Sequence, residues 1–271
     1  MLLSSLDSYP ARAPGLTDLA QRARHAEARA VSDPRRFPTT RHSVVLDVKS
    51  ADSVQRARAF EVIAATYWKP VYKYTRVRWK KSGDESAELT QAFFATAFEK
   101  GYFTGYDPSK ARFRTYVKMC LDRFISNAVR AGQRLKRGGN AVVVSIDAGQ
   151  AEHELAAHQW PSGDAMEEYF DAEWVRALLS LSVDELRSLC EDRGKEAHFQ
   201  LFERCVLADE QDRPAYAEIA QELGLSLSDV KNYLTFTRRE FRRIIIDKIR
   251  EITATEEEFR SEVRAVLGTS P

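Results

Sequence analysis

The sequence predicts an all-α protein with two helical domains joined by a flexible linker. Apolar residues recur every three or four positions over residues 51–137 and again over residues 165–250, which is the spacing of helices with one buried face. Between these stretches, residues 136–164 lose the pattern and contain Gly138-Gly139 and Pro161-Ser162-Gly163. With 271 residues, 44% apolar and 30% charged, the chain is long enough and apolar enough to fold.

Five segments follow one another along the chain. Residues 1–37 form an N-terminal extension rich in Ala, Arg, Ser and Pro, which we expect to be largely disordered with a short helix over residues 16–30. The first helical domain covers residues 38–135, and the linker covers residues 136–165 with His153 and His158 in it. The second helical domain covers residues 166–250, and an acidic tail that adds one more helix covers residues 251–271.

The charges are segregated although the net charge is only +1. Basic residues cluster at 69–81, 130–137 and 238–250, whereas acidic residues collect at 84–99 and in the tail, at Glu256, Glu257, Glu258 and Glu262. Such stripes suit a protein that contacts both nucleic acid and other proteins.

Targeting and catalytic signals are both missing from the sequence. No run of ~20 apolar residues and no secretory leader is found, so we expect a cytoplasmic protein without membrane contact. Cys120, Cys190 and Cys205 are odd in number and far apart, which favours buried thiols over disulfides or zinc. Without a phosphate-binding glycine loop, metal-ligand spacing or a GxSxG nucleophile, the expectation is no enzyme, no cofactor and no metal.

One amphipathic helix is predicted over residues 82–100. Ser82 followed three residues later by Glu85 is a capping box, and acidic residues suit the positive end of a helix. At roughly 100° per residue the helix has an apolar side and a polar side. The apolar side carries Leu89, Phe93, Phe94, Ala97 and Phe98, and the polar side carries Glu85, Glu88, Ala92, Thr96 and Glu99.

A helix-turn-helix is predicted over residues 215–243. Tyr216, Ile219, Ala220 and Leu223 would pack the first helix, Gly224 would supply the positive φ of the turn, and Val230, Leu234 and Phe241 would face inward from the second helix. The residues expected to point outward are polar or basic, as in helices that read the major groove. They are Ser228, Asp229, Lys231, Asn232, Thr235, Arg238 and Arg239.

Residues 102–124 interleave aromatic and basic side chains, which is the composition of single-strand DNA sites. Helical spacing assigns Phe113, Val117, Leu121 and Phe124 to the core and leaves three tyrosines as stacking candidates. Those tyrosines are Tyr102, Tyr106 and Tyr116, and the candidate phosphate contacts are Lys110, Arg112, Arg114, Lys118 and Arg123.

Taken in order, these motifs resemble bacterial RNA polymerase sigma factors of the extracytoplasmic-function type, in the subgroup with an LTQxFF run. The segments YWKPVYKYTRVR (67–78), ESAELTQAFF (85–94) and GYDPSKARFRTYVKMCLDRFISNAVR (105–130) resemble sigma region 2, and YAEIAQELGLSLSDVKNYLTFTRREF (216–241) resembles region 4. The resemblance implies a factor that docks on core polymerase, at the clamp helices of its largest subunit and at its flap. It also implies that the factor recognises the −10 and −35 promoter elements.

The resemblance also implies roles for individual residues. Glu85, Glu88, Leu89 and Gln91 match the polymerase-docking motif, in which Ala87 and Ala92 stand where the family usually has acids. Phe113, Arg114, Tyr116 and Asn127 match the helix that melts the −10 element. Because some family members are controlled by Ser/Thr kinases, a further hypothesis is that phosphorylation at Thr96 or Ser86 restores the missing negative charge, with Thr90 a less accessible candidate that leans toward the core.

Two other readings remain open. A sigma-like adaptor or decoy would bind DNA or an anti-sigma regulator without productively engaging polymerase. A helix-turn-helix repressor with an unrelated helical domain is the third reading, and the ordered match to region 2 argues against it.

Overall fold

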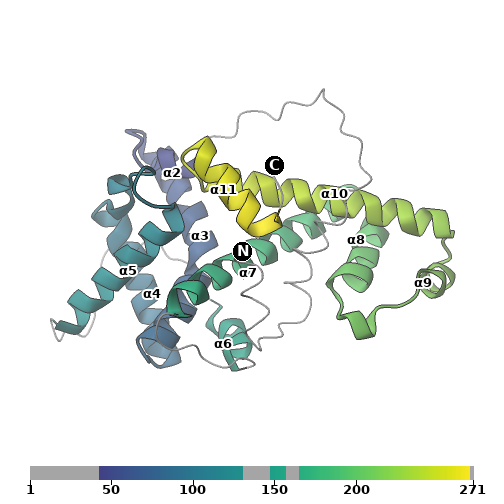
Figure 1. Cartoon of the computed structure of the whole chain (residues 1–271), viewed down its shortest axis with the longest axis horizontal. Helices are drawn as coiled ribbons and strands as arrows, with labels where there is room; N and C mark the ends of the chain where they lie inside the picture. The colour runs from purple at the N-terminus through teal and green to yellow at the C-terminus, as the bar shows by residue number, and fades with distance from the viewer. Residues whose placement is uncertain (1–42, 131–146, 157–164, 269–271) are drawn as a thin grey trace. The chain divides into compact units, whose positions relative to one another are not determined.

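The computed structural model describes residues 43–130, 147–156 and 165–268, and every regular element within them is helical (Figure 1). The all-α prediction is therefore confirmed for the described part of the chain. The predictions for residues 1–37, for His158 and for the glycine and proline stretches of the linker lie outside the described residues.

The described residues form two compact units. One unit falls within Arg41–Ala177 and Arg250–Phe259, and we call it the α3–α5 unit. The other falls within Leu178–Ile249 and Arg260–Pro271, and we call it the α8–α10 unit. The sequence places a boundary in residues 136–165, whereas these units divide inside a single 28-residue helix, between Ala177 and Leu178. The reason is that the first half of this helix buries Phe170 and Trp174 in the α3–α5 unit.

An aromatic core holds the α3–α5 unit together. Phe103 lies between Phe60 and Phe113, with ring centroids 5.7 Å and 5.6 Å away, and Phe93 packs edge-on against Phe94 at 5.2 Å. The Phe60–Phe103 pair is stacked and the other two are edge-to-face, and both arrangements add to the hydrophobic gain of burial. The unit contains α2 (Val44–Asp47), α3 (Ser53–Arg78), α4 (Gly83–Glu99), η3 (Tyr102–Gly105), α5 (Phe113–Arg130), α6 (Ala148–Ala156) and the first half of α7 (Ala165–Asp192).

The α8–α10 unit is built around one long helix. Phe202 packs on Phe241 with ring centroids 5.1 Å apart, and Ile219, Val230 and Leu234 are buried. The unit contains the second half of α7, α8 (Glu196–Phe202), the π turn η4 (Glu203–Leu207), η5 (Glu210–Asp212), α9 (Tyr216–Glu222) and most of α10 (Leu227–Glu251). The last helix, α11 (Glu256–Leu267), contributes to both units.

The three cysteines are free thiols, and two of them are buried. Cys190 and Cys205 are buried free thiols, as expected, whereas Cys120 is half-buried. None of the helices described here is both long enough and apolar enough to cross a membrane.

The turn between α9 and α10 depends on Gly224, whose φ is +63°. Leu225 N–H donates to the Ala220 carbonyl at 2.8 Å and Gly224 N–H donates to the Gln221 carbonyl, which together form a Schellman end for α9. A Cβ at Gly224 would meet no atom within 4 Å, so only the backbone conformation resists a larger residue.

We therefore expect Gly224→Ala to lower the free energy of unfolding by about 1 kcal/mol. Guanidinium denaturation of the purified protein measures this change. Gly194, with φ +60° and nothing within 4 Å of a Cβ, is the matched control. Gly194→Ala should cost as much stability, and an unchanged midpoint for Gly224→Ala would contradict the conformational argument.

Candidate nucleic-acid and protein interfaces

Helix α4 presents an acidic side, and its start is the predicted capping box. Ser82 Oγ accepts a hydrogen bond from Glu85 N–H at 3.2 Å, and Ser82 N–H donates to Glu85 Oε2 at 3.1 Å. These bonds from Ser82, with Lys81 nearby, lower the pKa of Glu85, so this carboxylate is charged at neutral pH. Glu85, Glu88 and Gln91 are exposed along α4.

The other docking candidates on α4 are less accessible. Leu89 is 8% exposed and belongs to the core, which corrects its assignment to a docking surface. Ala87 and Ala92 are half-buried, at the edge between the exposed acids and the packed side. Position 92 is one helical turn after Glu88, so an acidic side chain there would lie beside that carboxylate.

Two of the three predicted phosphorylation sites lie in the interior. Ser86 and Thr90 both have 0% exposure, and Thr90 Oγ1 donates to the Ser86 carbonyl at 2.7 Å. A kinase has to draw the hydroxyl into its own active site, so burial removes these two residues as candidates in this conformation. Thr96 is half-buried and is the candidate that remains.

The predicted −10 contacts are divided between covered and open positions. Tyr106 and Arg114 are each only 3% exposed, which corrects the expectation that they face DNA. Arg114 forms an ion pair with Asp171 at 3.2 Å, and its guanidinium lies 4.8 Å from the centre of the Trp174 ring. Both partners belong to the first half of α7, so the Arg114 side chain is bound within the protein. Tyr102, Arg112, Tyr116 and Lys118 are half-buried, and Lys110, Arg123 and Asn127 are exposed.

A carboxylate from the C-terminal segment holds the start of α5. Glu258 Oε1 accepts from Phe113 N–H at 2.7 Å and from the Tyr106 hydroxyl at 2.8 Å. Its Oε2 accepts from Ala254 N–H at 2.8 Å, and Glu258 is 7% exposed. An acid at the N-terminus of a helix satisfies a free N–H and the helix dipole together. The loop before α5 is thereby tied to residues 250–259 within the α3–α5 unit.

The first turns of α10 carry the polar face that the sequence predicts. Ser226 and Asp229 form a capping box, with Asp229 N–H donating to Ser226 Oγ at 3.1 Å and Ser226 N–H donating to Asp229 Oδ2 at 3.1 Å. Asp229 is therefore a cap and not an outward-facing contact. Ser228, Lys231, Asn232, Thr235 and Arg239 are exposed, and buried Val230 and Leu234 fix their direction.

Arg238 differs from these five residues. It is half-buried and its Nη2 donates to the Tyr216 hydroxyl at 3.3 Å, which links α10 back to α9. Tyr216 itself is 36% exposed, so it packs less than the sequence suggests. Arg238 is thus better placed to hold the two helices together than to reach a base.

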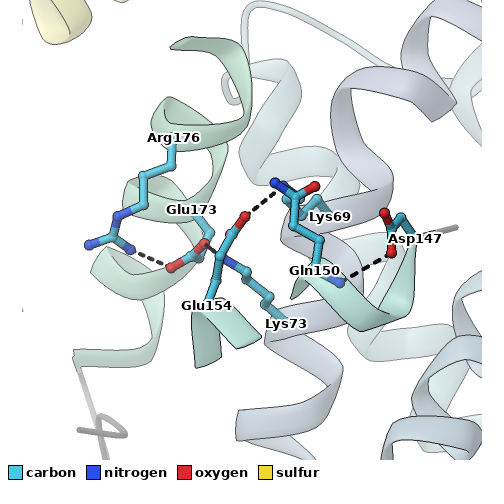
Figure 2. A network of polar contacts seen from close by, with 7 residues as sticks. All are labelled: Lys69, Lys73, Asp147, Gln150, Glu154, Glu173 and Arg176. Atoms are coloured by element: carbon cyan, nitrogen blue, oxygen red, sulfur yellow. Dashed lines mark hydrogen bonds and ion pairs between the residues drawn. The ribbon is translucent and has the colours of Figure 1, made fainter. Parts of the chain in front are cut away.

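One polar network was missed by sequence reasoning, because the expected flexible linker contains helix α6. Figure 2 shows this helix beside α3 and α7, with Glu154 accepting from Lys69 at 2.9 Å and from Lys73 at 2.5 Å. Lys73 also pairs with Glu173 at 2.7 Å, and Arg176 contacts the same Glu173. The spacing of 69, 73 and 76 on one helix face and the acids in AEHELA (151–156) are the signals that could have revealed it.

The pKa values of α6 make its docking depend on pH. Hydrogen bonds from Arg76 and Tyr72 outweigh burial and lower the pKa of Glu152 from its ordinary value of 4.5. Burial raises the pKa of Glu154, but the bonds from Lys73 and Lys69 outweigh it, so this pKa is lowered too. A lowered pKa means that docking is stabilised above pH 4.5 and is lost as the pH falls through the lowered values.

Below pH 4.5 we therefore expect the amides of α6 to lose protection before the rest of the α3–α5 unit unfolds. Hydrogen exchange read by mass spectrometry measures this, after correction for the intrinsic exchange rate at each pH. The Glu152→Gln/Glu154→Gln variant should already be unprotected at neutral pH. Protection that persists until the whole unit unfolds would show that these two carboxylates do not control docking.

Neither a metal-binding cluster in the described residues nor a match to a known protein indicates a function for this chain. Across the residues that the structure describes, no cluster of three or more His, Cys, Asp or Glu side chains could hold a metal ion. No protein-family model, curated protein or solved structure matches the chain.

Proposed function

We propose that this protein is a sigma-type transcription initiation factor that binds promoter DNA and core RNA polymerase. The observation that carries the proposal is the exposed polar face at the start of α10, behind the tight turn from α9. Lys231, Asn232 and Arg239 are exposed on that face, and Lys, Asn and Arg are residue types that contact bases and phosphates in a major groove. In this proposal α10 reads the −35 element, and the loop before α5, with α5 itself, binds the −10 element.

Helix α4 is the proposed polymerase-docking surface. Glu85, Glu88 and Gln91 are exposed on it and would meet the basic clamp helices of the largest polymerase subunit. Thr96 would be the target of a Ser/Thr kinase, and an anti-sigma regulator would compete for the same surface. The proposal includes two DNA-binding parts joined through the segment between α5 and α7, and a cytoplasmic location.

Adding the two missing acids tests the docking surface. We expect Ala87→Glu/Ala92→Asp to raise the retention of core polymerase at least about fivefold, because each new charge-assisted contact contributes ~0.5–2 kcal/mol. Pull-down with purified core enzyme measures retention, and Thr96→Glu should raise it in the same direction. The control Ala65→Glu/Ala217→Asp adds the same charge at exposed alanines of α3 and α9. Equal retention by wild type and the α4 variant would refute the charge deficit.

A second candidate function is a sigma-like adaptor that binds DNA without productive initiation. The burial of Tyr106 and Arg114 favours it, because these two residues cannot contact a −10 strand as they stand. Run-off transcription with core polymerase on candidate promoters separates the two functions. A defined transcript supports the initiation factor, whereas DNA binding and polymerase retention without any transcript support the adaptor.

A further inference from the structure

A row of donors runs along one face of α3. Lys69, Lys73 and Arg76 follow one another at spacings of four and three residues, with the Tyr72 hydroxyl among them. At 1.5 Å per residue the row is about 10 Å long. We call these four residues the α3 basic stripe.

Helix α6 covers the α3 basic stripe with two carboxylates. Arg76 donates to Glu152 through Nε at 2.5 Å and through Nη2 at 2.9 Å, and the Tyr72 hydroxyl donates to Glu152 Oε1 at 2.6 Å. Glu154 forms ion pairs with Lys69 and Lys73 (Figure 2). All four residues of the stripe therefore donate to carboxylate oxygens of one short helix.

The α3 basic stripe binds the carboxylates of α6 in a geometry that would also bind phosphate groups. A guanidinium that donates two parallel N–H bonds to Glu152 would hold two phosphate oxygens in the same way. The lysine ammonium groups act as point charges that suit either kind of anion. Lys69 also lies 5.9 Å from the ring of Trp68, which is half-buried, and an aromatic ring beside cations is typical of nucleic-acid sites.

Helix α6 is held weakly enough to be displaced. It has nine residues, and over residues 148–155 its buried apolar side chains are Ala151 and Leu155. Isolated helices shorter than about 12 residues are marginal in water, so the helix depends on its docking. Its carboxylates keep 37% exposure at Glu152 and 32% at Glu154, so salt and competing anions reach these pairs.

The local charge balance changes when α6 leaves. Three cations of the stripe face three carboxylates, from Glu152, Glu154 and Glu173. Without the two carboxylates of α6, Glu173 remains as the partner of Lys73, and the stripe has a net charge of +2 (three positive minus one negative). Such a surface attracts a polyanion.

We propose that the α3 basic stripe is a second nucleic-acid site, which binds a phosphate backbone, and that α6 covers it as an intramolecular competitor. This site is separate from the DNA contact proposed for α10. Nucleic acid that reaches the stripe displaces Glu152 and Glu154 and places phosphates on Lys69 and Arg76.

The test measures DNA binding by the full chain when α10 can no longer contribute. A background variant carries Lys231→Ala/Asn232→Ala/Arg239→Ala, and Glu152→Gln/Glu154→Gln is added to it. Fluorescence anisotropy follows labelled single-stranded and duplex DNA of about 30 nucleotides, longer than the ~4–16 nucleotides of single-strand sites. We expect affinity to rise at least about tenfold near 50 mM salt, with a salt slope steeper by about 1.4 for single strands or 1.8 for duplex. The two probes show which form the stripe prefers.

Three variants keep the result specific. Adding Lys69→Gln/Arg76→Gln should abolish the gain, because the phosphates lose their partners. Leu155→Gln should give a smaller gain, because it loosens α6 while both carboxylates stay in place. Glu61→Gln/Glu191→Gln makes the same change in net charge at exposed positions of α3 and α7 and should give no gain.

Two outcomes would overturn the proposal. One is an unchanged affinity and salt slope for both DNA probes in a variant whose circular dichroism matches the parent. The other is that this variant binds a peptide with the α6 sequence, DAGQAEHELA (147–156), but neither DNA, which would make the stripe a site for acidic helices. The α10 proposal is judged separately, by whether its three substitutions weaken DNA binding in the wild-type chain.

Discussion

Replacing both Lys231 and Arg239 with alanine is expected to lower the affinity of the full chain for duplex DNA by about 30-fold or more. Each cation contacting a base or phosphate contributes about 1–3 kcal/mol, and two such losses combine when the residues do not touch each other. The salt slope should become shallower by about 0.9 for each of the two cations that contacts a phosphate, or about 1.8 if both do.

Anisotropy with a labelled duplex over a salt series measures both quantities. The matched control is Arg193→Ala/Arg264→Ala, which removes the same charge at exposed positions in the α8–α10 unit. This control should change the affinity by less than about threefold, the size expected from net charge alone. If the control and the α10 variant behave alike, DNA binding by α10 is refuted, and only a general electrostatic attraction remains.

The largest expected effect on stability comes from Lys73. Its side chain is 3% exposed and lies between Glu154 on α6 and Glu173 on α7, so Lys73→Met leaves two acids without their shared cation. Removing one partner from a buried ion pair costs about 3–5 kcal/mol. We expect a loss near 3 kcal/mol, at the low end, because Glu173 keeps Arg176 and Glu154 keeps Lys69.

Guanidinium denaturation, followed by far-UV circular dichroism, measures this loss. Lys69→Met is the matched control, because Lys69 is more exposed and Glu154 would still be paired with Lys73. It should cost less than about 1 kcal/mol. Adding Glu173→Gln to Lys73→Met should recover part of the stability, because the more deeply buried of the two acids is then uncharged while Glu154 keeps Lys69. A cost for Lys73→Met no larger than that of Lys69→Met would contradict the shared-cation argument.

Local features were predicted well because their causes are local. The capping box at Ser82 and Glu85 and the positive φ of Gly224 are confirmed, and each depends on residues within a few positions of one another. The core positions Phe113, Val117 and Leu121 follow from helical spacing alone and are buried. The exposed face of α10 has the same origin.

The corrections concern contacts between residues far apart in the chain. Arg114 lies in a sequence pattern typical of DNA-binding segments, yet its side chain is buried in contact with Asp171 and Trp174 of α7. Tyr106 is covered because Glu258, 152 positions later, accepts its hydroxyl. Helix α6 was missed because nine residues are too few to establish a helical period in the sequence, and α3 supplies the cations that hold it.

The sequence by itself determined that the described chain is helical, where α4, α9 and α10 begin and turn, and which side of each is polar. These properties come from backbone preferences, capping and a periodicity of 3.6 residues, all of which act over one or two turns. Only the tertiary structure decided which polar side chains are free to bind a partner molecule. A cation is free for a ligand or bound within the protein according to which distant carboxylate lies within about 3 Å of it, and sequence spacing does not contain that distance. For Arg114 the carboxylate comes from α7, for Lys69 and Arg76 it comes from α6, and Lys73 has one from each.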